Sequence, residues 1–159
     1  MQIERRLDQL GLVLPEPTKV PPGVSVPFAW VRVHGDRAHV SGHGPLNRDG
    51  SPAAPFGRVG AEVSAEQGYA AARLATLAIL SSLKRSLGDL DRIAAWLRVS
   101  GMVSVGPGFT QTTNVINGCS DLLLEVFGPE VGMHARTAIG VAALPLNLPV
   151  IIAAEVAVR

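Results

Sequence analysis

Four histidines, His34, His39, His43 and His134, are the side chains best able to ligate a metal or to exchange protons near neutral pH. His39 and His43 are four residues apart, but the residues around them predict a strand and a turn. On a helix this spacing would place both rings on one face, and on a strand and turn it does not. We therefore predict no metal site, and the sequence also predicts no cofactor.

Cys119 is the only cysteine of the chain. It lies with Val115, Leu122 and Leu123 on the apolar stripe of a predicted helix, which favours a buried thiol over a nucleophile. A single cysteine excludes an internal disulfide. The glycine-rich segment 42–44 is a predicted turn without the strand–helix context of a phosphate-binding loop.

The elements that must position these residues follow one another as a helix, a hairpin, a helix, a strand, a helix and two strands. Ser64 and Gln67 form a capping-box pattern at the start of the first long helix, and Gly128-Pro129 ends the second. His34-Gly35-Asp36-Arg37 predicts a tight turn. The predicted elements are a helix at 3–12 within an N-terminal segment 1–14, a proline-rich connector at 15–27, strands at 28–33 and 38–41, a helix from the cap Ser64 to 87, a strand at 93–105, a helix at 112–127, and strands at 135–143 and 150–158.

This order predicts an α+β fold in which two long helices pack on one face of a mixed sheet. The whole chain, 1–159, is predicted to be one domain with its core at 28–158. The last strand, 150–158, is apolar at nearly every position, so both of its faces should be covered. Because the two helices can cover only one face, we expect a second subunit on the other.

The composition excludes several classes of protein. Of the 159 residues, 47% are apolar and 17% are charged, which indicates a folded domain rather than a disordered chain. The net charge of +1 argues against a nucleic-acid partner. The segment 1–14 lacks the apolar core of a signal peptide, and no apolar run is long enough to span a membrane. We therefore expect a cytoplasmic protein with no membrane partner.

Three motifs occur in an order and spacing that resemble a known family. They are Val40-Ser41-Gly42-His43, the helix segment Asn117–Gly128, and His134-Ala135-Arg136-Thr137-Ala138 followed by Leu144-Pro145. Together they resemble the RidA family, also called YjgF-like or endoribonuclease L-PSP, over most of the chain. The extra N-terminal helix and a slightly longer connector after the second long helix are similar to a divergent subgroup.

The resemblance implies a chorismate-mutase-like fold and a homotrimer with ligand clefts between its subunits. The best-understood members of the family hydrolyse reactive imines and enamines to keto acids and ammonia. In those members an arginine holds the substrate carboxylate and a glutamate positions the attacking water. The expected partner is therefore a small carboxylate metabolite.

Arg136 matches the carboxylate-binding arginine of the family, and its planar guanidinium can hold a carboxylate with two parallel hydrogen bonds. The alternatives are an intrachain ion pair or a solvated arginine at the sheet edge. Asn117 matches a pocket asparagine, with a helix-start cap as its alternative. The other positions that the resemblance brings to the cleft are Phe28, Ser41, Gly42, Ile116 and Ala138. Phe28 is as well suited to the core as to the wall of the pocket. For Ser41, a satisfied hydroxyl at the end of a strand is the more common outcome.

The catalytic position of the family does not carry an acid in this chain. Ile151 stands where the glutamate is expected, and an isoleucine can neither accept a proton nor orient a water. Phe28 lacks the hydroxyl of the tyrosine that many members carry there. Glu155 lies on the same strand about 13 Å away, which predicts a structural ion pair rather than a substitute. His134 is a weak candidate for the missing acid–base group.

Three functions follow from these observations. The first is an enzyme that hydrolyses a small imine or enamine acid with water activated by a group other than glutamate. The second is a non-catalytic module that binds or senses a small metabolite, and the missing acid at Ile151 favours it over typical deamination. The third is an enzyme with different chemistry in the same cleft. RNA cleavage, which one family name suggests, is disfavoured because the chain has no basic or aromatic platform.

Overall fold

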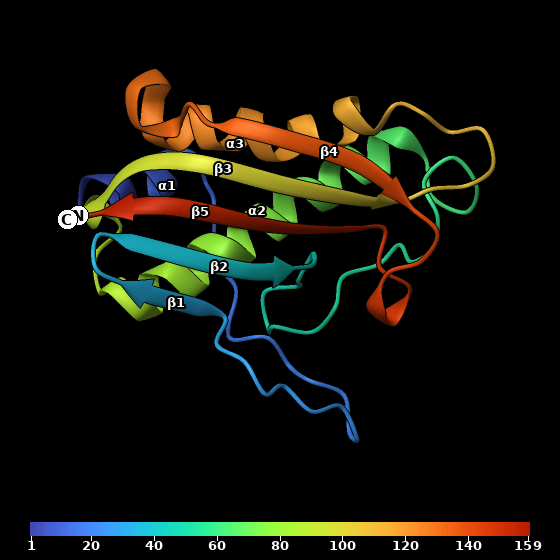
Figure 1. Cartoon of the computed structure of the whole chain (residues 1–159), viewed down its shortest axis with the longest axis horizontal. Helices are drawn as coiled ribbons and strands as arrows, with labels where there is room; N and C mark the ends of the chain where they lie inside the picture. Colours follow the sequence, from blue (N-terminus) through green and yellow to red (C-terminus); the bar gives the residue numbers. More distant parts are fainter.

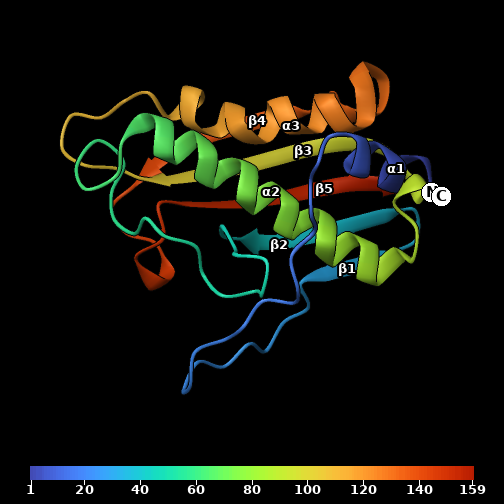
Figure 2. The same ribbon diagram turned by 180° about the vertical axis from the view of Figure 1, so that it is seen from behind.

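The computed structural model describes all residues from 1 to 159 and contains one five-stranded sheet with helices on one face. Figures 1 and 2 show α2 and α3 lying side by side across that face, with the opposite face bare. The predicted α+β fold is therefore confirmed. The elements are α1 (Gln2–Gln9), β1 (Val31–His34), β2 (Arg37–His43), α2 (Ala65–Leu87), the 3-10 turn η1 (Leu90–Arg92), β3 (Ile93–Ser104), α3 (Thr112–Gly132), β4 (Ala135–Val141), the 3-10 turn η2 (Pro145–Asn147) and β5 (Val150–Val158).

The sheet has the strand order β1-β2-β5-β3-β4 and is mixed. Only β3 and β4 run parallel, and every other neighbouring pair is antiparallel. The last strand, β5, buries alternate residues against the helices and leaves the positions between them half-buried. Within one chain, the apolar residues of β5 are therefore buried on one face of the strand only. The buried positions are Val150, Ile152, Val156 and Val158.

The ends of the two long helices follow the sequence signals. Ser64 and Gln67 form the expected capping box, because the Gln67 amide donates to Ser64 Oγ at 3.1 Å and the Ser64 amide donates to Gln67 Oε1 at 2.9 Å. In α3 the backbone of Gly128 turns to a φ of +77° just before Pro129. The straight part of α3 thus ends where the sequence predicts, and a short helical turn follows it.

The first strand is shorter than predicted, since it begins at Val31 and not at Phe28. Gly35 makes the two-residue turn with a φ of +61°. From this turn, β1 pairs with β2 as far as Val31 opposite Val40. On its other edge, β2 carries a bulge between Val40 and His43 that shifts its register against β5. Phe28 lies before β1, outside the sheet, and is 53% exposed.

The N-terminal helix also ends earlier than predicted, at Gln9, and Gly11 follows it with a φ of +67°. Leu7 anchors the helix in the core. The connector then crosses α2, where Ser81 Oγ donates to the carbonyl of Pro15. Residues Thr18–Phe28, which we call the projecting arm, extend away from the body of the molecule before returning to β1 (Figures 1 and 2).

None of the helices is both long enough and apolar enough to span a bilayer.

Candidate functional site

Arg136 lies on β4 and points toward α3. Its Nη1 donates to Asn117 Oδ1 at 2.8 Å and to Ser120 Oγ at 3.0 Å, and its Nη2 donates to the Thr113 carbonyl at 3.4 Å. All three acceptors are neutral, so the ion-pair alternative is wrong and the charge of the half-buried guanidinium has no counter-charge. An uncompensated guanidinium held in place by neutral acceptors is a suitable partner for an anion.

Asn117 holds this arginine from the second turn of α3. The helix begins at Thr112, five residues before Asn117, so the cap alternative for Asn117 is wrong. Ile116 lies beside it but is fully buried, and a Cβ on Gly101 would come within 2.6 Å of its side chain. Ala138 lies on β4 two residues after Arg136, where its carbonyl accepts a hydrogen bond from Thr112.

Ser120 connects Arg136 to His134. Ser120 Oγ lies 2.8 Å from His134 Nε2, and His134 Nδ1 lies 2.8 Å from the carbonyl of Gly132. A carbonyl can only accept, so Nδ1 carries the hydrogen, and in this single-proton tautomer Nε2 accepts from Ser120. Hydrogen bonds are therefore donated from Arg136 to Ser120, from Ser120 to His134 and from His134 to Gly132. We call Arg136, Ser120 and His134 the half-buried relay.

A cleft of about 330 Å³ lies on the other side of the molecule, between the projecting arm, the end of β2 and η2. Three predicted site residues, Phe28, Gly42 and Ile151, line it. Its walls are mostly apolar, and we call it the apolar cleft. Its lining residues are Thr18, Lys19, Val20, Pro21, Val24, Ser25, Val26, Phe28, Trp30, Gly42, His43, Gly44, Pro45, Leu46, Pro52, Pro145, Leu146, Leu148 and Ile151.

The bulge in β2 brings Gly42 against Ile151. A Cβ at Gly42 would lie 2.7 Å from Ile151 Cγ2, so only glycine fits this approach. Phe28 packs edge-on against Trp30 with ring centroids 5.3 Å apart. Ser41 does not line the cleft; its hydroxyl donates to the carbonyl of Ala29 at 2.7 Å.

His43 lies behind Trp30 and is held like His134. Its Nδ1 contacts the carbonyl of Ser41, and its Nε2 lies 2.8 Å from Ser82 Oγ, which accepts from Arg85 Nη2 at 3.1 Å. His43 is 2% exposed. Burial, together with the nearby Arg85, lowers the pKa of His43, so the ring is neutral at pH 7. We call Arg85, Ser82 and His43 the buried relay, after its buried histidine and serine, although Arg85 itself is exposed. The sequence predicts neither relay.

The two parts of the expected site are far apart in one chain. β4, which carries Arg136, is three strand positions from β2, or roughly 14 Å at about 4.8 Å per spacing. Arg136 also points to the helix-covered face, whereas Ile151 lies on the open one. A single chain therefore does not bring Arg136 together with Phe28, Gly42 and Ile151.

Two structural predictions are confirmed. Glu155 forms an ion pair with Arg37, with 3.0 Å between Oε1 and Nη1. Cys119 is buried, and its burial raises the pKa of its thiol to about 11. The thiol is therefore protonated at neutral pH and is not poised as a nucleophile.

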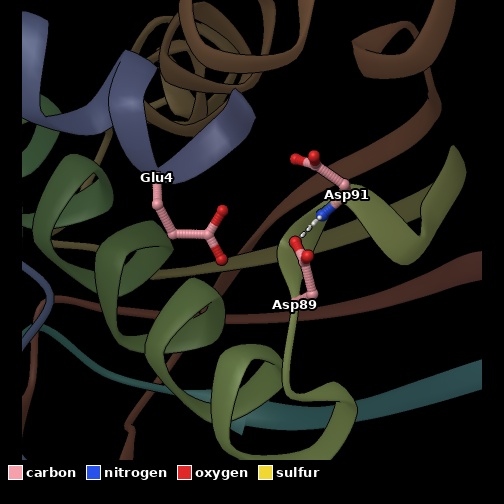
Figure 3. A group of neighbouring side chains, drawn as sticks. All are labelled: Glu4, Asp89 and Asp91. Carbon is pink, nitrogen blue, oxygen red and sulfur yellow. Dashed lines mark hydrogen bonds between the residues drawn. The ribbon is translucent and has the colours of Figure 1, made fainter. Parts of the chain in front are cut away.

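Three acidic side chains, Glu4, Asp89 and Asp91, meet where α1 lies against η1 (Figure 3). The Met1 amino group lies within 3.2 Å of an oxygen of each, and Lys84 Nζ lies 2.7 Å from Glu4. Burial alone would raise the pKa of Glu4, but hydrogen bonds from Lys84 and the backbone lower it to about 2. These carboxylates hold cations of the chain itself and fasten α1 to the body.

Comparison with known proteins places the chain in a family. The model described as "YjgF/chorismate_mutase-like, putative endoribonuclease" matches residues 4–156, which include most of α1 and the whole projecting arm. Protein TCP17 of Trypanosoma cruzi is 39% identical over 149 residues, which cover 94% of this chain and 89% of that protein.

Two solved structures are similar over nearly the whole chain. Atu1372 of Agrobacterium tumefaciens, of unknown function, is 36% identical with a TM-score of 0.85, covering 98% of this chain and 91% of its own. A protein from Shewanella oneidensis, described as a putative endoribonuclease, is 33% identical with a TM-score of 0.87, covering 98% and 99%. TdcF of E. coli, solved with bound serine, shares the fold at 18% identity and a TM-score of 0.58, covering 91% and 98%. The chain belongs to the YjgF family, which also contains the RidA and endoribonuclease L-PSP proteins.

Proposed function

We propose that this protein binds a small carboxylate-bearing metabolite, and that Arg136 holds the carboxylate. The observation that carries the proposal is the uncompensated charge of Arg136, fixed by Asn117 and Ser120. Both of these bonds use Nη1, and Nε has no partner in the chain. The Nε and Nη2 edge of the guanidinium is therefore oriented while keeping donors for a bidentate carboxylate.

We further propose that the site is completed by a second copy of the chain in a homotrimer, as the family resemblance implies. The register across the open face aligns Ile151 with Met102 and Met102 with Ile139, in a row over β5, β3 and β4. Ile139 is 48% exposed, and a row of aliphatic side chains on a sheet face favours a protein partner. Light scattering should give the mass of three chains, and a stable monomer would contradict the shared cleft.

Ligand binding agrees better with the site than imine hydrolysis does. Ile151 cannot orient a water, and both ring nitrogens of His43 and of His134 already have partners. Ile151, His43 and His134 therefore offer no free acid or base atom in place of the family glutamate. TdcF was solved with serine, an amino acid whose carboxylate belongs to the class of ligand proposed here.

The test is calorimetric titration with a panel of 2-oxo acids from pyruvate to phenylpyruvate, each beside its methyl ester. A hydrogen bond to a charged group contributes about 1.5–3 kcal/mol, so Arg136→Ala should weaken binding of the acids roughly 10- to 100-fold. Arg136→Lys keeps the charge but loses the planar fork, so its affinity for the acids should lie between those of the wild type and Arg136→Ala. Arg73→Ala, on the outer side of α2, is the control and should bind as the wild type does.

Esters that bind as tightly as the acids, or full affinity in Arg136→Ala, would overturn the proposal. A second assay separates binding from catalysis. Imino acids generated in situ by an amino-acid oxidase should disappear no faster when the protein is added. Acceleration that is lost in Arg136→Ala would show an imine hydrolase despite Ile151.

A further inference from the structure

We propose that the apolar cleft selects the ligand, and that the protein takes a monocarboxylate with a bulky branched or aromatic side chain rather than a short one. This inference rests on the proposed function, because it assumes that Arg136 of one copy holds the carboxylate. The cleft of a second copy then receives the rest of the molecule.

The walls of the apolar cleft are built from three separate parts of the chain. The projecting arm contributes Val20 and Val24, η2 and the residue after it contribute Leu146 and Leu148, and β5 contributes Ile151. Val24 is 51% exposed and Leu146 is 47% exposed, although both are strongly apolar. Contact with an apolar ligand group would remove this surface from water, which is the main favourable term in such binding.

An aromatic wall closes one side of the cleft. Phe28 meets Trp30 edge-on at 5.3 Å, and Trp30 meets the ring of His43 at 5.1 Å. The exposed face of Phe28 has no hydroxyl, so this wall offers packing and no hydrogen bond. Such a surface suits an aliphatic branch or another ring.

Outside the projecting arm, the lining of the cleft carries few polar side chains. His43 uses both nitrogens, one on the Ser41 carbonyl and one on Ser82. Lys19 is the only charged side chain in the lining, and its Nζ lies 3.5 Å from Asp49. A hydroxyl, amide or second carboxylate of the ligand that faces η2 and β5 would lose water there without gaining a side-chain partner, which costs binding energy.

The size of the cleft points the same way. Its volume of about 330 Å³ lies at the lower end of the range of roughly 300–1,000 Å³ that is usual for ligand sites. The methyl group of pyruvate would leave most of this space unfilled, whereas an isobutyl or benzyl group would contact several walls at once. Selection by side-chain size is therefore built into the arm, η2 and β5.

The experiment compares dissociation constants for pyruvate, 4-methyl-2-oxopentanoate, phenylpyruvate and 2-oxoglutarate, measured by calorimetry on the full-length protein. We expect the two bulky apolar acids to bind at least tenfold more tightly than pyruvate, and 2-oxoglutarate to bind no better than pyruvate. Ile151→Gln, which places an amide in the cleft, should reduce the preference for the bulky acids over pyruvate at least fivefold.

Leu146→Ala is the second variant, because this exposed side chain can be shortened without opening the core. It should weaken phenylpyruvate binding three- to tenfold and so lower the preference for phenylpyruvate over pyruvate. Equal affinity for all four acids, with Arg136→Ala still disruptive, would overturn the size preference but keep the carboxylate site. Binding of none of them, or binding that ignores Arg136→Ala, would instead overturn the proposed function.

Discussion

His43 and His134 are held by the same arrangement of hydrogen bonds in opposite parts of the molecule. In both, Nδ1 faces the carbonyl two residues earlier, and Nε2 faces a serine that also accepts from an arginine. In both, the serine lies on a long helix that packs on the sheet. The buried relay is Arg85, Ser82 and His43, and the half-buried relay is Arg136, Ser120 and His134.

The two relays differ in what surrounds the arginine and the ring. His43 is sealed behind Trp30 with 2% exposure, and Arg85 donates to both Ser81 and Ser82. Arg136, by contrast, lies on the edge strand β4 and donates across to Asn117 and Ser120 of α3. In the buried relay the arginine therefore bonds to serines of its own helix, whereas in the half-buried relay it joins the sheet to α3, where we propose that it holds a ligand.

The largest expected difference between the relays is in stability. His43→Ala removes a buried ring and leaves Ser82 without its acceptor, and should lower the free energy of unfolding by about 2–4 kcal/mol. His134→Ala acts at a half-buried ring and should cost less than about 1 kcal/mol. Urea denaturation measures both, and similar losses would show that the relays do not differ in this way.

The pH dependence of stability tests the buried relay next. Burial lowers the pKa of His43, so below about pH 6.5 the unfolded chain binds a proton that the folded chain does not. The contribution of the neutral His43 to the free energy of unfolding is complete above about pH 6.5. It is lost as the pH falls toward the pKa of the folded state, by up to about 1.4 kcal/mol per pH unit. His43→Gln should lack this part of the slope between pH 7 and pH 5. An unchanged slope would mean that His43 does not titrate as its burial requires.

The two serines give the smallest and most selective effects. Ser120→Ala removes one of the bonds that orient Arg136 and should weaken carboxylate binding about three- to tenfold, with a loss of stability below about 1 kcal/mol. Ser82→Ala should show the reverse, with lower stability and unchanged affinity. Calorimetric titration and urea denaturation of both variants test these opposite effects on affinity and stability. A loss of carboxylate affinity in Ser82→Ala would contradict the difference between the two relays.

The sequence predicts regular elements well because their signals are local. The boundaries of β5 follow from its apolar run at 150–158, and the capping box fixes the start of α2. The prediction that the first strand begins at Phe28 is wrong, because β1 pairs with β2 only from Val31 onward, and an apolar run does not show where pairing begins.

The site was less predictable than the fold because it depends on contacts between distant residues. The family resemblance identifies Arg136 and Asn117, and the structure brings them together across 19 residues. His43 contacts Ser82, 39 residues away in the sequence, only because α2 packs on β2. No periodic pattern of the sequence predicts that contact. The strand order that separates Arg136 from Ile151 likewise arises from the topology.

The most direct measurement is a crystal structure of the protein with 4-methyl-2-oxopentanoate bound. We expect the carboxylate within hydrogen-bond distance of Nε and Nη2 of Arg136 from one copy, with the isobutyl group against Phe28 and Ile151 of another. A carboxylate bound away from Arg136, or a ligand held wholly within one chain, would contradict the shared site that Arg136 and the apolar cleft are proposed to form.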